Sequence, residues 1–97
     1  MATYLTLIKF TEHGSKDIKD TCKRAEEFKT HAKKHGIELK VQYWCMGAYD
    51  GFLVFEAPDD ETATSAILSL GSRQSVTTQT LRAFGAAEMS RIIGKVM

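Results

Sequence analysis

The sequence predicts a single α+β domain, with the element order β-α-β-β-α-β and a further helix at the C-terminal end. A chain of 97 residues is of a length that forms one domain. Its composition, 43% hydrophobic and 26% charged, is typical of a soluble globular protein and excludes a disordered or collagen-like chain. Apolar residues repeat with the spacing of strands in some segments and of helices in others, which gives the order of elements.

The first strand is expected at residues 3–10, where both faces are largely apolar, as in a central strand covered on two sides. A loop at 11–14 follows. The next segment has the apolar stripe of an amphipathic helix, which a detached first turn can precede and which Gly36 ends in a left-handed conformation. The stripe consists of Ile18, Cys22, Ala25, Phe28 and Ala32.

Residues 37–46 alternate between apolar and polar and predict a second strand, and Phe52–Phe55 predicts a short third one. The turn between them contains Asp50-Gly51, a dipeptide typical of hairpins. A second helix is expected to follow Asp59, whose carboxylate suits an N-cap. Its stripe is Ala63, Ala66, Ile67 and Leu70, and Gly71 closes it.

Residues 76–84 are rich in β-branched side chains and predict the fourth strand. A last helix is expected from about Ala86, with Met89, Ile92, Ile93 and Val96 on one face. The complete order is that of the ferredoxin-like split βαβ arrangement. Right-handed crossovers then place both long helices on one face of a four-stranded antiparallel sheet, with the first and third strands at its centre.

The two faces of this sheet can be assigned from the alternation along each strand. The helix side is expected to carry Leu5, Leu7, Ile37, Leu39, Val41, Leu53, Phe55 and Leu81. The opposite face is expected to carry Tyr4, Thr6, Ile8, Gln42, Trp44, Phe52, Val54, Glu56, Thr78, Thr80 and Arg82.

Such a mixture of aromatics and hydroxyls suits a face that is covered but partly polar. Two sheets packed face to face in a homodimer would cover it and enclose a barrel whose interior can hold a ligand, the dimeric α/β-barrel type of architecture. The alternative is an ordinary open sheet with a few exposed aromatics.

The segment 47–60, GAYDGFLVFEAPDD, resembles the signature of the GYD-domain family, named for its Gly-Tyr-Asp turn. Residues 20–25, 43–44 and 78–84 support the resemblance, which covers nearly the whole chain as one GYD-type domain, residues 1–97. The sequence departs from the family at Cys22, where relatives often have proline. The resemblance implies a place near the dimeric α/β-barrel superfamily, which includes cofactor-free monooxygenases, isomerases and haem-handling enzymes, and it implies the fold without fixing a reaction.

Tyr49 and Asp50 are the candidate catalytic residues, because a phenol and a carboxylate can act as proton donor and base. The alternative is that Asp50 supplies turn geometry and Tyr49 packs over the hairpin. Candidate ligand-binding residues are Tyr4, Trp44, Glu56, Thr80 and Arg82. The Arg82 guanidinium could hold a carboxylate or phosphate of a ligand, or it could form an internal ion pair with Glu56.

No metal or cofactor is expected. His31 and His35 lie four residues apart on one helix face, as two zinc ligands would, but no third ligand is near in sequence and a solvated pair explains them. Cys22 is interpreted as a small apolar residue of the helix stripe. Cys45 is a candidate nucleophile if it is exposed in electropositive surroundings.

The net charge of +1 gives no reason to expect nucleic-acid binding, and no apolar stretch is long enough to span a membrane. The absence of a charged leader and the presence of only two cysteines suggest a cytoplasmic protein. Two functions fit these observations. One is a homodimer, or a higher oligomer of dimers, that binds or processes a small molecule between sheet and loops. The other is a non-catalytic interaction or assembly module whose aromatic sheet face serves oligomer packing.

Overall fold

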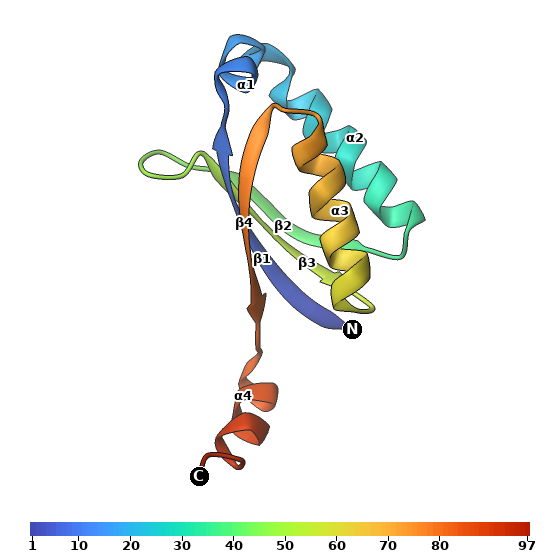
Figure 1. The fold of residues 1–97 in the computed structure, drawn as a ribbon, viewed down its shortest axis with the longest axis vertical. Coiled ribbons are helices and arrows are strands. Elements are labelled where there is room, and N and C mark those ends of the chain that lie inside the picture. Colours follow the sequence, from blue (N-terminus) through green and yellow to red (C-terminus); the bar gives the residue numbers. More distant parts are fainter.

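A computed structural model describes all residues from 1 to 97, and it contains one antiparallel sheet with the strand order β2-β3-β1-β4 (Figure 1). The predicted ferredoxin-like arrangement is confirmed, with β1 and β3 at the centre. The elements are β1 (Ala2–Phe10), α1 (Glu12–Lys16), a 3-10 turn (Ile18–Asp20), α2 (Thr21–Lys34), β2 (Glu38–Trp44), β3 (Gly51–Ala57), α3 (Asp60–Ser72), β4 (Val76–Ala83) and α4 (Ala86–Ile93).

Helices α2 and α3 pack side by side on one face of the sheet (Figure 1). The core forms where Tyr4, Leu53 and Phe55 of the sheet meet Phe28 of α2 and Ala63 of α3, all of them buried. The rings of Tyr4 and Phe55 stack with their centroids 5.3 Å apart. The two helices therefore bury one sheet face and leave the other uncovered.

The register shows which residues of β1 face the helices. Tyr4 lies opposite Phe55 and Arg82, and Thr6 lies opposite Leu53 and Thr80, so these residues share the helix side. Directly opposed residues of antiparallel strands point to the same face.

The alternate residues of β1 point to the opposite face. Leu5 pairs with Val54 and Leu81, and Leu7 pairs with Phe52, which places these five side chains on the uncovered face. The predicted faces of β1 and β4 are therefore wrong, including the placing of Tyr4, Ile8, Thr78, Thr80 and Arg82 on the uncovered side.

The physical reason is that the polar groups on the helix side find partners. The Tyr4 hydroxyl donates a hydrogen bond of 2.5 Å to Asp60 Oδ1. The hydroxyl oxygens of Thr6 and Thr80 lie 2.8 Å apart and share a hydrogen bond. Burial of a polar group is unfavourable only when its hydrogen bonds are lost.

The alternation along β2 is broken by a bulge. Leu39 pairs with Phe55, but Val41 pairs with Val54, so the register shifts between Leu39 and Val41. One extra residue reverses the parity of everything that follows it. Leu39 faces the helices as predicted, whereas Val41 joins the uncovered face, and Gln42 and Trp44 point to the helix side, contrary to expectation.

The segment predicted as a loop at 11–14 is mostly helical, since α1 begins at Glu12 and Thr11 caps it by accepting a hydrogen bond of 3.1 Å from the Gly14 amide. Gly14 packs tightly on the start of β4, where a Cβ would collide with the Ser75 carbonyl oxygen. A separate 3-10 turn precedes α2, and Ile18 and Cys22 are exposed. The helix stripe is thus confirmed only from Ala25 onward.

Helix α3 begins as predicted, because the Asp59 carboxylate accepts a 2.8 Å hydrogen bond from the Thr62 amide. Gly36 has the predicted left-handed backbone, with φ of 79°. Helix α4 extends away from the body of the molecule, beyond the end of β4 (Figure 1), and none of its residues is buried. No helix combines the length and the apolar character that crossing a membrane requires.

Candidate functional site

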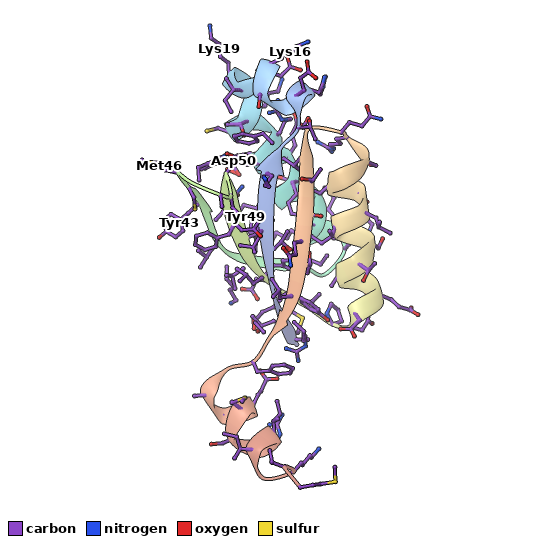
Figure 2. All side chains as sticks on the ribbon, turned by 60° about the vertical axis from the view of Figure 1, so that its left-hand side comes forward. Lys16, Lys19, Tyr43, Met46, Tyr49 and Asp50 are labelled. Atoms are coloured by element: carbon purple, nitrogen blue, oxygen red, sulfur yellow. The ribbon has the colours of Figure 1, made fainter.

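Tyr49 and Asp50, the candidate catalytic pair, bond to different partners. The Tyr49 hydroxyl donates a 3.2 Å hydrogen bond to Gln79 Oε1 of β4, on the uncovered face of the sheet (Figure 2). Asp50 Oδ2 accepts a 2.7 Å hydrogen bond from the Phe10 amide at the end of β1. No hydrogen bond joins the phenol to the carboxylate, and the catalytic role of the pair stays a prediction.

Asp50 holds the β2–β3 connection against the end of β1. The Asp50 amide donates to the Ile8 carbonyl, and the Asp50 carbonyl accepts from the Cys45 amide. Both hydrogen bonds are 2.8 Å long, and they add to the side-chain bond from the Phe10 amide. The Asp50 backbone is not left-handed, and the positive φ of 109° in this connection belongs to Gly47. The turn predicted at residues 47–51 is found as a loop between Trp44 and Gly51, but the expectation that Asp50 itself supplies a positive φ is wrong.

The predicted pair of Arg82 and Glu56 does not form, because their side chains lie on opposite faces of the sheet. Glu56 lies 3.4 Å from Lys40 Nζ on the uncovered face. The Arg82 guanidinium lies over the Tyr4 ring at 5.6 Å and the Phe84 ring at 4.6 Å. It also forms an ion pair of 3.3 Å with Glu88 of α4 and donates to the carbonyls of Thr3 and Ala83.

The other candidate ligand residues are engaged in structural contacts. The pKa of Tyr4 is raised, chiefly because its hydroxyl donates to Asp60 and also because it is buried. Thr80 is bonded to Thr6, and the Trp44 indole donates a 3.3 Å hydrogen bond to Thr21 Oγ1 at the start of α2. Tyr4, Thr80 and Arg82 are neighbours on the helix side of the sheet, whereas Trp44 lies on β2 at the opposite edge and Glu56 lies on the uncovered face. The structure therefore does not bring the five candidates together, and their role as ligand-binding residues stays a prediction.

The histidines and cysteines form no metal centre. The rings of His31 and His35 lie 4.7 Å apart, and no group of three or more His, Cys, Asp or Glu side chains is placed to hold a metal ion. Both cysteines are free and exposed. The interpretation of Cys22 as part of the buried helix stripe is therefore wrong.

Two exposed apolar surfaces are the main features left by the fold. The first, the open face, is the uncovered side of the sheet, where Tyr43 is 62% exposed and packs its ring on Phe52 at 5.6 Å (Figure 2). Sequence reasoning placed four of its seven apolar residues on the helix side, because it put the leucines inward and did not foresee the bulge before Val41. The apolar residues of the open face are Leu5, Leu7, Val41, Tyr43, Phe52, Val54 and Leu81.

The second surface lies on the C-terminal arm, residues 84–97, which contains α4. Its base is fixed to β4 by the Arg82–Glu88 ion pair, and Glu88 Oε1 accepts a 3.3 Å hydrogen bond from the Gly85 amide. Both contacts lower the pKa of Glu88, with the bond from Gly85 the larger cause. Beyond this base the arm presents an exposed apolar stripe of Met89, Ile92, Ile93 and Val96.

The chain exposes more surface than a compact monomer of its size. Its accessible area is 6728 Å², whereas about 5,500 Å² is expected for a folded 10.8 kDa monomer. Its radius of gyration is 14.6 Å, against about 12.5 Å expected for this length. The surplus of about 1,200 Å² is comparable to what one partner loses in a protein–protein interface, about 800 Å².

A four-stranded antiparallel sheet with two helices on one face and an apolar opposite face left open defines the class of this protein, a small α+β domain with a ferredoxin-like fold. The family model of the GYD domain matches residues 4–93, and the chain belongs to this family. It is similar to a protein of Thermus thermophilus named "Glutamine synthetase and cystathionine beta-lyase binding protein". The two are 33% identical over 90 residues, which cover 92% of this chain and 95% of the relative.

Proposed function

We propose that this protein is a protein-binding module that works as a homodimer, or as a higher oligomer of dimers. The open face forms the interface between two copies, and the C-terminal arm binds a partner enzyme. The observation that carries the proposal is the pair of apolar surfaces that one chain cannot cover by itself. Two exposed, unpaired cysteines fit a reducing compartment, and we place the protein in the cytoplasm.

The open face suits a second copy of the same chain. It is a continuous apolar patch, and a twofold axis would bring leucines and aromatics of one copy against those of the other. The surplus area of about 1,200 Å² exceeds the roughly 800 Å² that each partner buries in a standard interface. Lys40, Glu38 and Glu56 at its margin, joined by ion pairs, would form the polar rim.

The arm suits a groove on another protein. Its stripe at positions 89, 92, 93 and 96 has the spacing of helices that lay one apolar side into a hydrophobic groove. The family match extends to residue 93, the end of α4, so it includes the arm as far as this helix. The relative is named for binding two enzymes, and we propose enzymes of the same kinds, glutamine synthetase and cystathionine β-lyase, as the first partners to test.

The dimer is tested by Leu81→Glu, which puts a charge in the open face, where Leu81 is 43% exposed. We expect sedimentation to show a dimer or an even oligomer for the wild type and a shift to monomer for this variant. The matched control is Leu68→Glu, because Leu68 is 68% exposed on the outer side of α3 and should leave the oligomer unchanged. A monomeric wild type at micromolar concentration would overturn the proposal.

Partner binding is tested with purified glutamine synthetase and cystathionine β-lyase from the same organism as this chain. Ile93→Asp, in the middle of the arm's apolar stripe, should abolish binding measured by biolayer interferometry while the dimer persists. Ser90→Asp adds the same charge to α4 outside the stripe and serves as the control. Equal binding by both variants would show that the arm is not the contact.

A further inference from the structure

A small cavity lies on the helix side of the sheet, between α2 and the ends of the strands. Its volume is about 60 Å³, it is partly open to solvent, and most of its walls are hydrophobic. Phe28 and Leu53 contribute apolar walls and Trp44 lies at its exposed side. Three charged side chains also line it, Arg24, Asp50 and Arg73.

Arg24 is the unusual member of this set. Its Nη1 donates a 2.9 Å hydrogen bond to the Asp17 carbonyl, but its Nη2 is buried and has no hydrogen-bond partner. No other buried side-chain nitrogen or oxygen in the chain lacks a partner. A buried guanidinium N–H without an acceptor is unfavourable, and such groups find their acceptor in a water molecule, an ion or a ligand.

Neither of the other charged side chains of the cavity accepts a hydrogen bond from Arg24 Nη2. Arg73 has only donors, and it forms an ion pair of 3.3 Å with Glu27. The Asp50 carboxylate accepts from the Phe10 amide and forms no ion pair with Arg24. Its negative charge on the cavity wall disfavours a multiply charged anion such as phosphate, because like charges in a partly buried site repel.

The size of the cavity limits the ligand further. A dry cavity of about 150 Å³ holds the six carbon atoms of a benzene ring, so one of about 60 Å³ accommodates roughly two or three non-hydrogen atoms. A carboxylate group has this size and one negative charge, and because the cavity is partly open, a short aliphatic chain attached to it can extend along the hydrophobic walls toward the solvent.

We propose that this cavity binds the carboxylate group of a small organic acid, with one carboxylate oxygen accepting a hydrogen bond from Arg24 Nη2. The aliphatic part of the acid extends along the hydrophobic wall toward the open side of the cavity, which Trp44 borders. The cavity lies on the opposite side of the sheet from the open face. Binding at this cavity is therefore independent of the proposed dimer and of partner binding by the arm.

The test uses the full chain and two probes of equal shape, propionate and its neutral amide, propionamide. NMR titration should show saturable shifts of the Arg24 side chain and the Trp44 indole with propionate, with a Kd of about millimolar for so small a ligand. Propionamide should bind at least about tenfold more weakly, since it lacks the charge-assisted hydrogen bond.

Arg24→Gln should remove the saturable response, whereas Lys23→Gln, which removes the same charge from the exposed neighbouring position, should preserve it. Equal shifts with the two probes, no saturation by propionate, or full binding by Arg24→Gln would each show a solvent-filled void and overturn the proposal. The comparison of the two probes on the wild-type chain decides the question even if Arg24→Gln does not fold.

Discussion

On strand β1, Tyr4 and Thr6 face the helices and are buried, whereas Leu5 and Leu7 face the other way and are only half-buried. The polar residues can be inside because each finds a partner, Asp60 for Tyr4 and Thr80 for Thr6. The leucines have no cover within the chain. A single strand therefore serves two purposes, with one side stabilising the monomer and the other available for association.

The contrast teaches that burial depends on partners as much as on polarity. A satisfied hydroxyl loses little on burial, and an exposed leucine is tolerated when another protein surface covers it in the assembled state. The surplus area and the extended arm agree with this view, because both leave apolar surface that folding of one chain does not bury.

The strongest test of this contrast compares two phenylalanines of β3 that are separated by two residues. Phe55 is 1% exposed in the core, and Phe52 lies on the open face. Phe55→Ala should lower the free energy of unfolding by about 3–5 kcal/mol at every protein concentration. Phe52→Ala should have a smaller effect that depends on concentration, because it acts mainly on association. Chemical denaturation over a range of concentrations measures both.

The comparison fails if Phe52→Ala costs as much as Phe55→Ala in dilute, monomeric protein. That result would show that the open face contributes to the fold of a single chain. An unchanged oligomer in Phe52→Ala, together with concentration-independent stability, would place the subunit interface elsewhere.

The order of elements was predictable from the sequence because it depends on local patterns. The apolar spacing of α2 from Ala25 onward, the apolar spacing of α3, the cap at Asp59 and the left-handed Gly36 are all local signals, and the structure confirms them. The crossover rule then placed β1 and β3 at the centre of the sheet.

The assignment of side chains to the two faces of the sheet was not predictable from local patterns. The parity of β1 depends on hydrogen-bond partners that lie 56 and 74 residues away, and no local pattern reveals them. The bulge between Leu39 and Val41 reverses the end of β2 without a distinctive residue. The site residues followed these errors, since Arg82 and Glu56 were paired across a face that they do not share.

A second prediction concerns Asp50, which ties the β2–β3 connection to β1. Asp50→Asn should change stability little, because the amide oxygen can accept the same hydrogen bond from the Phe10 amide. Asp50→Ala should lower the free energy of unfolding by about 1–3 kcal/mol, because it leaves this donor without its acceptor. Urea denaturation and hydrogen exchange of the Phe10 amide measure the effect. A stable Asp50→Asn protein that lost binding or turnover of a ligand would instead favour a chemical role for the charge.

A smaller effect is expected at the hydroxyl pair on the buried side. Thr80→Val leaves the fully buried Thr6 hydroxyl without its partner and should cost about 1–2 kcal/mol. The double variant Thr6→Val, Thr80→Val removes both hydroxyls and should recover most of this loss. Thr3→Val, on the open side of β1, is the control and should be nearly neutral in thermal denaturation. Additive losses in the double variant would mean that packing, and not the hydrogen bond, determines the cost.

The smallest predicted effect is a difference in pH dependence between α4, in the C-terminal arm, and α3, which is packed on the core. Glu88 caps α4 and Asp59 caps α3, and in both the hydrogen bond from a backbone amide is the largest cause of a lowered pKa. A carboxylate with a lowered pKa in the folded state stabilises its helix above its ordinary pKa, and this contribution is lost as the pH falls through the folded value. Helix α3 is packed on the core and should persist, whereas α4 has no buried residue and should fray.

Amide exchange and backbone chemical shifts, followed from about pH 6 to about pH 2, should therefore show the first turn of α4 opening while α3 remains protected. Glu88→Gln should make the first turn of α4 less sensitive to pH, and Glu12→Gln, on the distant α1, should change nothing in the arm. Simultaneous loss of both helices would mean that the arm is coupled to the core, and the division between a self-sufficient body and an arm that awaits a partner would have to be abandoned.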